Sequence, residues 1–474
     1  MKNTSKQSAH NGIRNRRKFL GEASCSAIGS SSLLSTLLSL RLTSSLSAAD
    51  TDSEGDYKAL VCVFLAGGND SFNMLAPVDD AGYEDYASSR EGVALPVSDF
   101  TPFPDPIPAP DGRTLGFHSG MTDLHQLFVE GKAAAVANVG TLVEPTTLAG
   151  IDAGSVDLPL GLFSHADQQK HWHSGLPQTR SALTGWGGRM ADLLTDLNVV
   201  SDVSMNVSIA GNNIFQTGAT TVPLTRTASF IPRLTSFQFG SFLNRRTAIE
   251  SMMEAEYRHA FEGYIASSKE DAIAVTEELR LALSESPGVI STFDQNNVLS
   301  RQLKAVAETI SARDCLGKRR QTFFVEVGGW DHHSSLDNHP AMLAQLSAAI
   351  GEFQVAMGEL GLEDKVTLFT ASDFGRTLSP NGTGTDHAWG GNQIVVGGAV
   401  DGGQVFGTYP ELTLASSLDT GRGRLIPTTS VDEYFADLAL WMGVSATDLP
   451  SVLPNLSRFH DVAIDGPPLG LMKP

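Results

Sequence analysis

Short apolar runs recur along the chain, and each ends in glycine or in polar residues. These runs lack the alternation of a strand that is exposed on one face, and continuous runs are typical of strands buried on both faces of a parallel sheet. The pattern predicts six strands, which lie within residues 60–70, 133–140, 203–209, 321–329, 366–373 and 392–399.

Apolar positions with helical spacing lie between these runs, most clearly at residues 248–284, 297–312, 340–360 and 431–441. Strands that alternate with helices indicate βαβ units. We therefore predict an α/β fold with a doubly wound, mostly parallel sheet, helices on both faces and a single domain over residues 50–474. Residues 245–290 are a possible helical cap, and the segments 141–160 and 210–235, rich in Gly, Thr and Pro, are predicted to be loops.

The first 49 residues have a different pattern. Arg16 and Arg17 precede a serine-rich, moderately apolar segment at residues 27–40, and small residues follow up to Ala49. This pattern is typical of a twin-arginine export signal that is removed on maturation. The apolar segment is too short for a stable membrane span, and an uncleaved anchor is the alternative. We therefore expect export in the folded state to the periplasm or the extracellular space.

Composition excludes several classes of function. Outside residues 1–49 the chain carries 26 basic and 52 acidic groups. Such a surface excludes nucleic acid as a partner, because that affinity rests on cationic contacts. Cys62 and Cys315 are the only cysteines outside the same segment, which excludes a disulfide framework and a zinc site built from cysteines. The sequence does not identify a protein partner.

Candidate metal ligands lie where the predicted strands end. Asp70 follows the first strand in GGND, Asp331 follows the fourth and Asp373 ends the fifth, while His387 lies in a glycine-rich loop before the sixth. Ligands of open parallel sheets bind beyond the carboxyl ends of the strands. Carboxylates that gather there are costly unless a cation neutralises them. The pattern predicts a site for a divalent metal ion, with Ca, Mg and Zn all open.

The stretch WDHH adds a second ligand beside Asp331. Residues two apart in an extended segment point to the same side, and the residue between them points away. Asp331 and His333 are therefore predicted to share the site, whereas His332 is not. A solvated turn is the alternative for this stretch, and an Asx turn that caps the next element is the alternative for Asp70.

Two further residues are candidates for the catalytic chemistry. Ser164 stands where a helix begins, so that helix amides could stabilise an alkoxide and an oxyanion at this point. A helix cap completed with Asp167 is the alternative. Arg376 in SDFGRT could grip a tetrahedral oxyanion with two donors, or it could form an ion pair that tethers its loop.

An ordered set of sequence blocks resembles the bacterial family known as domain of unknown function 1501. The blocks span most of residues 50–465 and include FLAGGNDSFNMLAP, GFHSGMTDLHQL, SHADQQ, TGWGGRM, GGWDHH, SDFGRT and GTDHAWGG. Members typically carry twin-arginine signals, and the family is similar to the alkaline phosphatase/sulfatase-like superfamily. The resemblance implies a doubly wound core with one or two metal ions.

The resemblance also implies roles for single residues. Asp70 matches the metal aspartate of the first strand, and Ser164 is the match to the hydroxyl nucleophile. One metal would be held by Asp331, His333 and His387, and the other by Asp373. Phe374 stands where the superfamily has a metal-binding histidine. The second site would therefore be oxygen-rich and favour Mg²⁺ or Ca²⁺ over Zn²⁺, or it would be empty.

Two functions follow from these residues. The first is an exported metal-dependent hydrolase of phosphate or sulfate esters, with a small anionic ester or a sulfated or phosphorylated glycan as substrate. Ser164 would attack, and Arg376 would bind the oxyanion. The alternative is a non-catalytic, metal-stabilised envelope protein that binds a glycan or a partner protein. A serine hydrolase without a metal is disfavoured, because the chain has no G-x-S-x-G motif.

Overall fold

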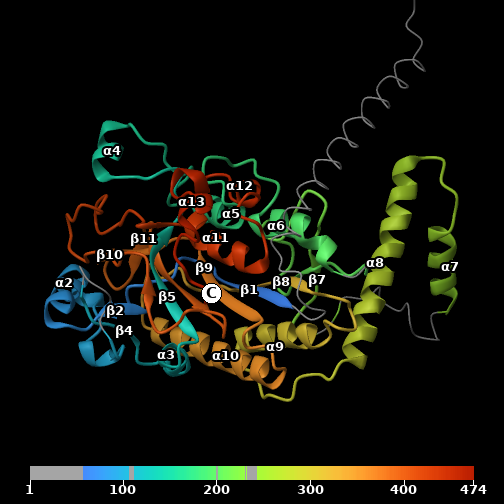
Figure 1. The fold of residues 1–474 in the computed structure, drawn as a ribbon, viewed down its shortest axis with the longest axis horizontal. Coiled ribbons are helices and arrows are strands. Elements are labelled where there is room, and N and C mark those ends of the chain that lie inside the picture. Colours follow the sequence, from blue (N-terminus) through green and yellow to red (C-terminus); the bar gives the residue numbers. More distant parts are fainter. Residues whose placement is uncertain (1–56, 106–111, 199–200, 230, 232–242) are drawn as a thin grey trace, which may run out of the picture.

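The computed structural model describes residues 57–105, 112–198, 201–229, 231 and 243–474. The predicted export signal over residues 1–49 lies outside these residues. A central sheet has the strand order β13-β5-β12-β9-β1-β8-β6-β7, with β14 beside β5 (Figure 1). Its strands are β1 (Lys58–Leu65), β5 (Ala133–Gly140), β6 (Asn206–Ser208), β7 (Leu224–Thr225), β8 (Arg320–Val327), β9 (Val366–Ser372), β12 (Gly391–Val396), β13 (Val405–Phe406) and β14 (Thr429–Ser430). The six predicted strands are all present.

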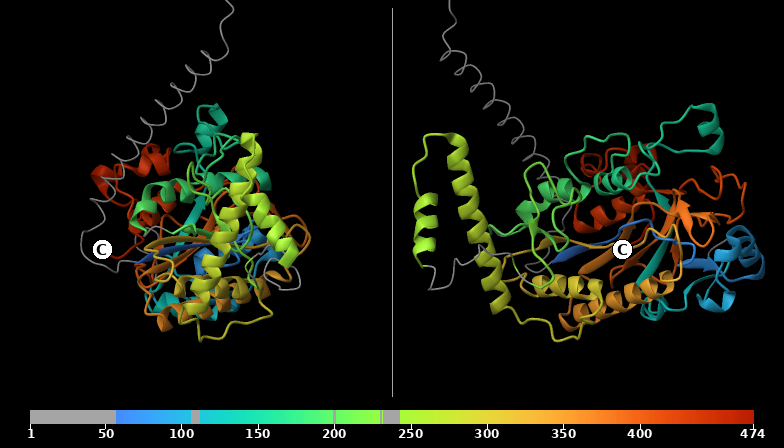
Figure 2. Two further views of the ribbon diagram at one scale, coloured as in Figure 1. Left: turned by 90° about the vertical axis from the view of Figure 1, so that its right-hand side faces the viewer. Right: turned by 180° about the vertical axis from the view of Figure 1, so that it is seen from behind.

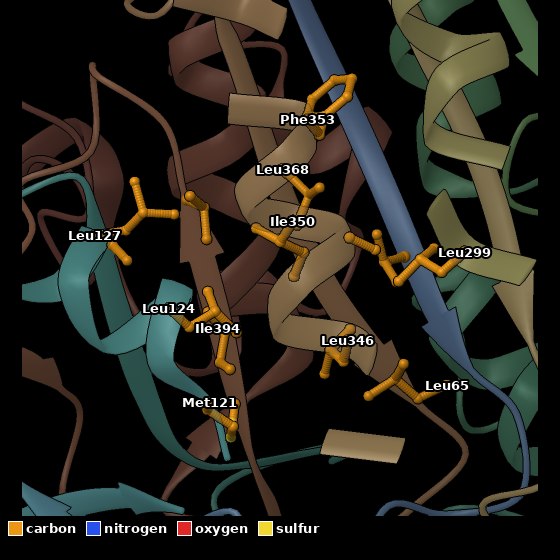
Figure 3. Close-up of a cluster of buried hydrophobic side chains, with 14 of the residues drawn as sticks. Leu65, Met121, Leu124, Leu127, Leu299, Leu346, Ile350, Phe353, Leu368 and Ile394 are labelled. Atoms are coloured by element: carbon orange, nitrogen blue, oxygen red, sulfur yellow. The ribbon is translucent and has the colours of Figure 1, made fainter. Parts of the chain in front are cut away.

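Helices cover both faces of this sheet (Figures 1 and 2). One layer contains α3 (Thr122–Val129), α9 (Val298–Ser311) and α10 (His339–Glu359), and the other contains α5 (His165–Ser174), α6 (Trp186–Leu194), α11 (Val431–Met442) and α12 (Leu449–Val452). Side chains of β1 alternate between the layers, because Val61 and Val63 pack in the first cluster and Leu60 and Phe64 in the second. Figure 3 shows part of the first cluster. The predicted doubly wound α/β fold is confirmed.

The direction of β12 decides where its preceding loop lies. β1 pairs in parallel with β8 and β9, whereas β12 runs antiparallel to both β5 and β9. The residues before an antiparallel strand lie at the same edge as the residues that follow its neighbours. His387, which precedes β12, is therefore at the carboxyl edge of β1, β8 and β9. Had β12 run parallel to them, His387 would lie at the opposite edge.

The remaining elements surround this core. They are β2 (Leu75–Pro77), α2 (Asp80–Arg90), β3 (Phe100–Pro102), β4 (Leu115–His118), α4 (Leu148–Ala153), β10 (Arg376–Pro380), β11 (Thr385–His387) and α13 (Val462–Asp465). Helix α4 lies in the segment 141–160 that was predicted to be a loop. It begins there because the Thr147 side chain accepts from the amide of Gly150, and it ends at Gly154, which has a left-handed conformation.

The predicted helical stretch at residues 248–284 forms two helices, α7 (Leu243–Met253) and α8 (Ala260–Glu285). The pair projects from the end of the molecule opposite to β10 and β11 (Figures 1 and 2). Leu279 and Ala282 anchor α8 in a small apolar cluster with Val203 and Leu316. In this position the pair does not cover the ends of β10 and β11. No helix among the described residues is long and apolar enough to cross a membrane.

The buried carboxyl of Asp432, at the start of α11, makes stability depend on pH. Burial raises its pKa to about 8 against the opposing charge of Arg189. The folded state keeps a proton that the unfolded chain releases above about pH 4. The free energy of unfolding should therefore fall by up to about 1.4 kcal/mol per unit as pH rises to about 8, and level off above it. Denaturant midpoints at about pH 5 and about pH 8 should differ less in Asp432→Asn than in the unchanged chain; equal differences would contradict this assignment.

Candidate metal centre

Side chains from three distant segments meet beside the carboxyl ends of β8 and β9. His165 begins α5, Asp331 follows β8 and His387 ends β11, and one ligand atom of each lies within 4.8 Å of the others. His333 joins them, because its Nε2 atom lies 3.1 Å from Oδ1 of Asp331 and 2.8 Å from Nε2 of His387. The structure thus brings together Asp331, His333 and His387, which were predicted as ligands, and adds His165.

Each of the three histidines donates from its Nδ1 atom to an oxygen. The acceptors are Asp373 for His165 at 2.5 Å, Asp386 for His333 at 3.1 Å and the carbonyl of Phe163 for His387 at 2.7 Å. With the proton on Nδ1, a neutral imidazole presents the lone pair of Nε2. Histidines that bind metals are held in this way by a carboxylate or a carbonyl. Burial also lowers the pKa of His387, which favours its neutral form.

The spacing of the four side chains fits one metal ion. Nε2 of His387 lies 3.4 Å from Oδ1 of Asp331, and Nε2 of His165 lies 3.5 Å from Oδ2 of the same carboxylate. Ligand atoms around a tetrahedral zinc ion, at about 2.0–2.1 Å from it, lie about 3.3 Å apart. Two Nε2 atoms as close as those of His333 and His387 repel each other unless a proton or a cation lies between them. The donor set and its spacing therefore fit a divalent ion.

Sequence reasoning left His165 unassigned. It lies in SHADQQ, where a helix start explained the pattern without a metal. The signal that could have found it is its position as the first helical residue, since the side chain of Ser164 caps the helix through the amide of Asp167. A side chain at that position projects from the end of the helix, which here points at the strand ends of the sheet.

Asp373, which was predicted as a metal ligand, lies beside the centre, and its oxygens are engaged by protein donors. Oδ1 accepts from the amide of Gly67 at 3.2 Å, and Oδ2 accepts from His165 at 2.5 Å and from Gln169 at 3.1 Å. Burial raises the pKa of Asp373, and the hydrogen bond from His165 opposes the rise. In this arrangement Asp373 orients His165. Its role as a direct ligand stays a prediction.

Arg376 is buried and holds Asp331. Its guanidinium donates to Oδ1 of Asp331 at 2.8 Å, to the carbonyl of Thr385 at 2.5 Å and to the carbonyl of Gly67 at 3.4 Å. Burial alone would raise the pKa of Asp331, but the hydrogen bond and the charge of Arg376 lower it below its ordinary value. These contacts fit the ion-pair alternative of the sequence, and binding of an oxyanion by Arg376 stays a prediction.

The WDHH stretch has the predicted alternation. His332 is buried and points away from Asp331, with contacts from its ring to the carbonyl of Trp330 and to Asn338, both at 3.0 Å. Asp331 and His333 share the other side, where they are partly exposed. The extended backbone after β8 thus separates a residue that stabilises the loop from two residues of the centre.

Asp70 is not part of this cluster. Its Oδ2 atom accepts from Arg90 of α2 at 2.6 Å, and both side chains are fully buried. Burial would raise the pKa of Asp70, and the charge of Arg90 lowers it below the ordinary value. Oδ1 of Asp70 has no hydrogen-bond partner among the described residues. An arginine thus supplies the positive charge that the sequence assigned to a metal ion, and metal binding by Asp70 stays a prediction.

Phe374 packs where a second metal ligand was expected. Its ring centroid lies 4.9 Å from that of His165 and 4.4 Å from that of His387. Gly68 has a φ of +86°, and a Cβ atom there would lie 2.5 Å from the Phe374 ring. GGND therefore needs its second glycine so that the loop after β1 can pass this ring.

Ser164 caps α5, which was the structural alternative in its sequence motif. Its hydroxyl accepts from the amide of Asp167 at 3.4 Å, and the side chain is half-buried. Asp167 is in turn held by Arg180 at 2.7 Å. A hydrogen bond from Ser164 also helps to lower the pKa of the Asp167 carboxyl. Its role as a nucleophile stays a prediction.

The sequence matches the family model described as a protein of unknown function, DUF1501, over residues 57–420. No curated protein matches the sequence significantly. Similar solved structures include the PsFucS1 sulfatase from Pseudoalteromonas sp. (12% identity, 87% of this chain, 73% of that chain, TM-score 0.36), a variant of the alkaline phosphatase PafA (9%, 69%, 64%, 0.29) and Ps i-CgsB in complex with k-i-k-neocarrahexaose (10%, 85%, 77%, 0.32). At these TM-scores the likenesses decide nothing about a reaction. The family model covers well over half of the chain, so this protein belongs to the DUF1501 family.

Proposed function

We propose that this protein binds one divalent metal ion and hydrolyses phosphate or sulfate esters beside it. The observation that carries the proposal is the set of three imidazoles, each held at Nδ1 by an oxygen, whose Nε2 atoms gather around one carboxylate. The proposed ligands are His165, Asp331, His333 and His387. Three nitrogen ligands and one oxygen ligand favour Zn²⁺ over Mg²⁺ or Ca²⁺, which prefer oxygen.

The residues around the ion have separate roles in this proposal. A bound divalent ion supplies charge stabilisation and Lewis acidity. The Ser164 hydroxyl attacks the phosphorus or sulfur atom and the alcohol leaves, which gives an ester of Ser164 that water then hydrolyses. The amides at the start of α5, of which that of Asp167 already donates to this oxygen at 3.4 Å, stabilise the negative charge that develops there. Asp373 and Arg376 keep His165 and Asp331 in position.

We also infer that the protein works outside the cytoplasm. The support is the RNRRKFL stretch with its serine-rich apolar segment and the small residues up to Ala49. Twin-arginine export carries folded proteins, so a metal ion can be inserted before export. Fractionation of cells that produce the full chain tests this point, since export predicts a shorter chain in the periplasm or the medium.

Metal analysis and an ester panel test the proposed function together. Purified protein should contain one equivalent of a divalent ion and hydrolyse at least one aryl phosphate or aryl sulfate. A chelator should abolish turnover and lower the melting temperature, because a ligand at about 100 times its dissociation constant stabilises by about 2.7 kcal/mol. Protein that contains no metal ion after growth and refolding with zinc, manganese, magnesium or calcium would disprove the proposal.

A non-catalytic protein with a structural ion is the second candidate. The observation that favours it is His333, whose Nε2 atom would complete a four-ligand shell with no position left for substrate. Closed tetrahedral sites are typical of structural zinc, whereas catalytic sites keep an open position. A chelator that lowers the melting temperature, in a chain with no turnover on any ester, would favour this candidate.

A further inference from the structure

Arg424 is held next to the proposed metal centre by two contacts. Its Nε atom donates to the carbonyl of His387 at 3.1 Å, and its guanidinium carbon lies 5.0 Å from the centre of the Phe163 ring. Phe163 in turn accepts from Nδ1 of His387 at 2.7 Å. The three residues therefore form one unit. It places a positive charge beside His387, a proposed ligand, and beside Phe163, the residue before Ser164.

The backbone that carries Arg424 is fixed. Asp419 accepts at 2.7 Å from the amides of both Gly421 and Gly423 through one carboxylate oxygen, and at 3.0 Å from the amide of Ala415 through the other. Asp419 also forms a β-bridge with Leu425. A tight, internally hydrogen-bonded turn presents the side chain at little entropic cost, which is what a binding group requires.

Arg424 differs from the other arginines of this region in its free donors. Arg376 is fully buried and forms an ion pair with Asp331, and Arg422 pairs with Asp386 at 2.6 Å. Arg424 is only half-buried, and no contact among the described residues engages its two terminal nitrogens. With Nε fixed on a carbonyl, the outer edge of the guanidinium keeps two N–H donors in the planar arrangement that matches two oxygens of a tetrahedral anion.

We infer that Arg424 binds the anionic oxygens of the substrate, an inference that rests on the proposed function and gives its anion-binding group. The ligand class is a tetrahedral oxyanion, with phosphate and sulfate sharing the geometry. Phe163, whose side chain is partly exposed, packs against the guanidinium and so fixes its orientation. Arg376, which the sequence suggested for this role, instead has its donors on Asp331, Thr385 and Gly67.

Anion binding by the metal-loaded protein tests this inference without relying on turnover. Calorimetric titration with inorganic phosphate and, separately, inorganic sulfate should show binding to the unchanged chain. Arg424→Gln should weaken the preferred anion roughly 10- to 100-fold, as expected for loss of two hydrogen bonds from a charged donor. Arg424→Lys should recover part of the loss, because lysine keeps the charge without the planar pair of donors. Metal content and melting temperature should not change in either variant.

Arg280→Gln is the matched control. It removes the same charge from a partly exposed position on α8, where Arg280 pairs with Glu277, and should leave anion affinity unchanged. The inference fails if Arg424→Gln binds the anion as the unchanged chain does, if it loses its metal ion and its melting temperature together, or if neither anion binds at all. Binding that depends on Arg424, in a protein that hydrolyses no ester, would uphold the inference and refute the hydrolase. Ester hydrolysis with normal kcat/KM in Arg424→Gln would uphold the hydrolase and refute the inference.

Discussion

His165→Ala should purify without its metal ion and without ester hydrolysis. His165 brings its Nε2 atom to 3.5 Å from Asp331 while Asp373 holds its Nδ1 atom. Loss of a residue that only orients a ligand typically costs about 10- to 100-fold in metal affinity. Loss of the ligand itself should cost more, so metal analysis after gel filtration should find the ion in the unchanged chain and little in the variant.

Two further variants make this result specific. Asp373→Asn removes only the carboxylate that orients His165, so its metal affinity should fall between that of His165→Ala and that of the unchanged chain. His125→Ala serves as the control, because His125 lies in α3, where Nε2 of its ring is hydrogen-bonded to the carbonyl of Pro102. Full metal occupancy in His165→Ala would exclude His165 as a ligand and leave Asp331, His333 and His387 as the proposed set.

The strands of the sheet could be predicted because their sequence signal is local. All eight residues of β5 are buried, and so are seven of the eight in β1, which is why both read as continuous apolar runs. Asp331 and His333 could be predicted for the same reason, since side chains alternate along any extended segment. In both cases neighbouring residues suffice, without knowledge of the partner strand.

The rest of the centre depends on contacts between distant segments. His165 joins Asp373 across more than two hundred residues, and nothing within SHADQQ indicates this contact. The antiparallel direction of β12, which brings His387 to the centre, is set by its pairing with β5 and β9. Arg424 likewise acquires its neighbours only through the fold. These features are tertiary, and the local pattern of each segment is compatible with several outcomes.

The sequence also could not predict which groups balance the negative charge at the strand ends. Carboxylates gathered there need positive charge, and a metal ion was the natural expectation. The structure supplies two buried arginines as well, Arg90 for Asp70 and Arg376 for Asp331. Arg90 ends α2 and carries no motif, so only the packing of α2 beside β10 makes it a partner. With these two arginines present, the charge at the strand ends fits one metal ion better than two.

Arg90→Met should therefore be one of the most destabilising substitutions in the chain. Arg90 and Asp70 are fully buried and 2.6 Å apart. Removal of one partner leaves an uncompensated charge in the interior, which typically costs about 3–5 kcal/mol. Denaturant unfolding should show a loss of this size in Arg90→Met and in Asp70→Asn, each measured alone.

The double variant Asp70→Asn/Arg90→Met decides what this pair does. If the pair only balances charge, the double variant should be more stable than either single variant, because no unpaired charge remains. All three variants should then keep one equivalent of metal ion, since Asp70 lies outside the histidine cluster. Loss of metal in Asp70→Asn, with normal metal content in Arg90→Met, would instead make Asp70 a ligand, as the resemblance to the phosphatases implies. Stability and metal content measured on the same four proteins thus separate a built-in counter-charge from a metal site.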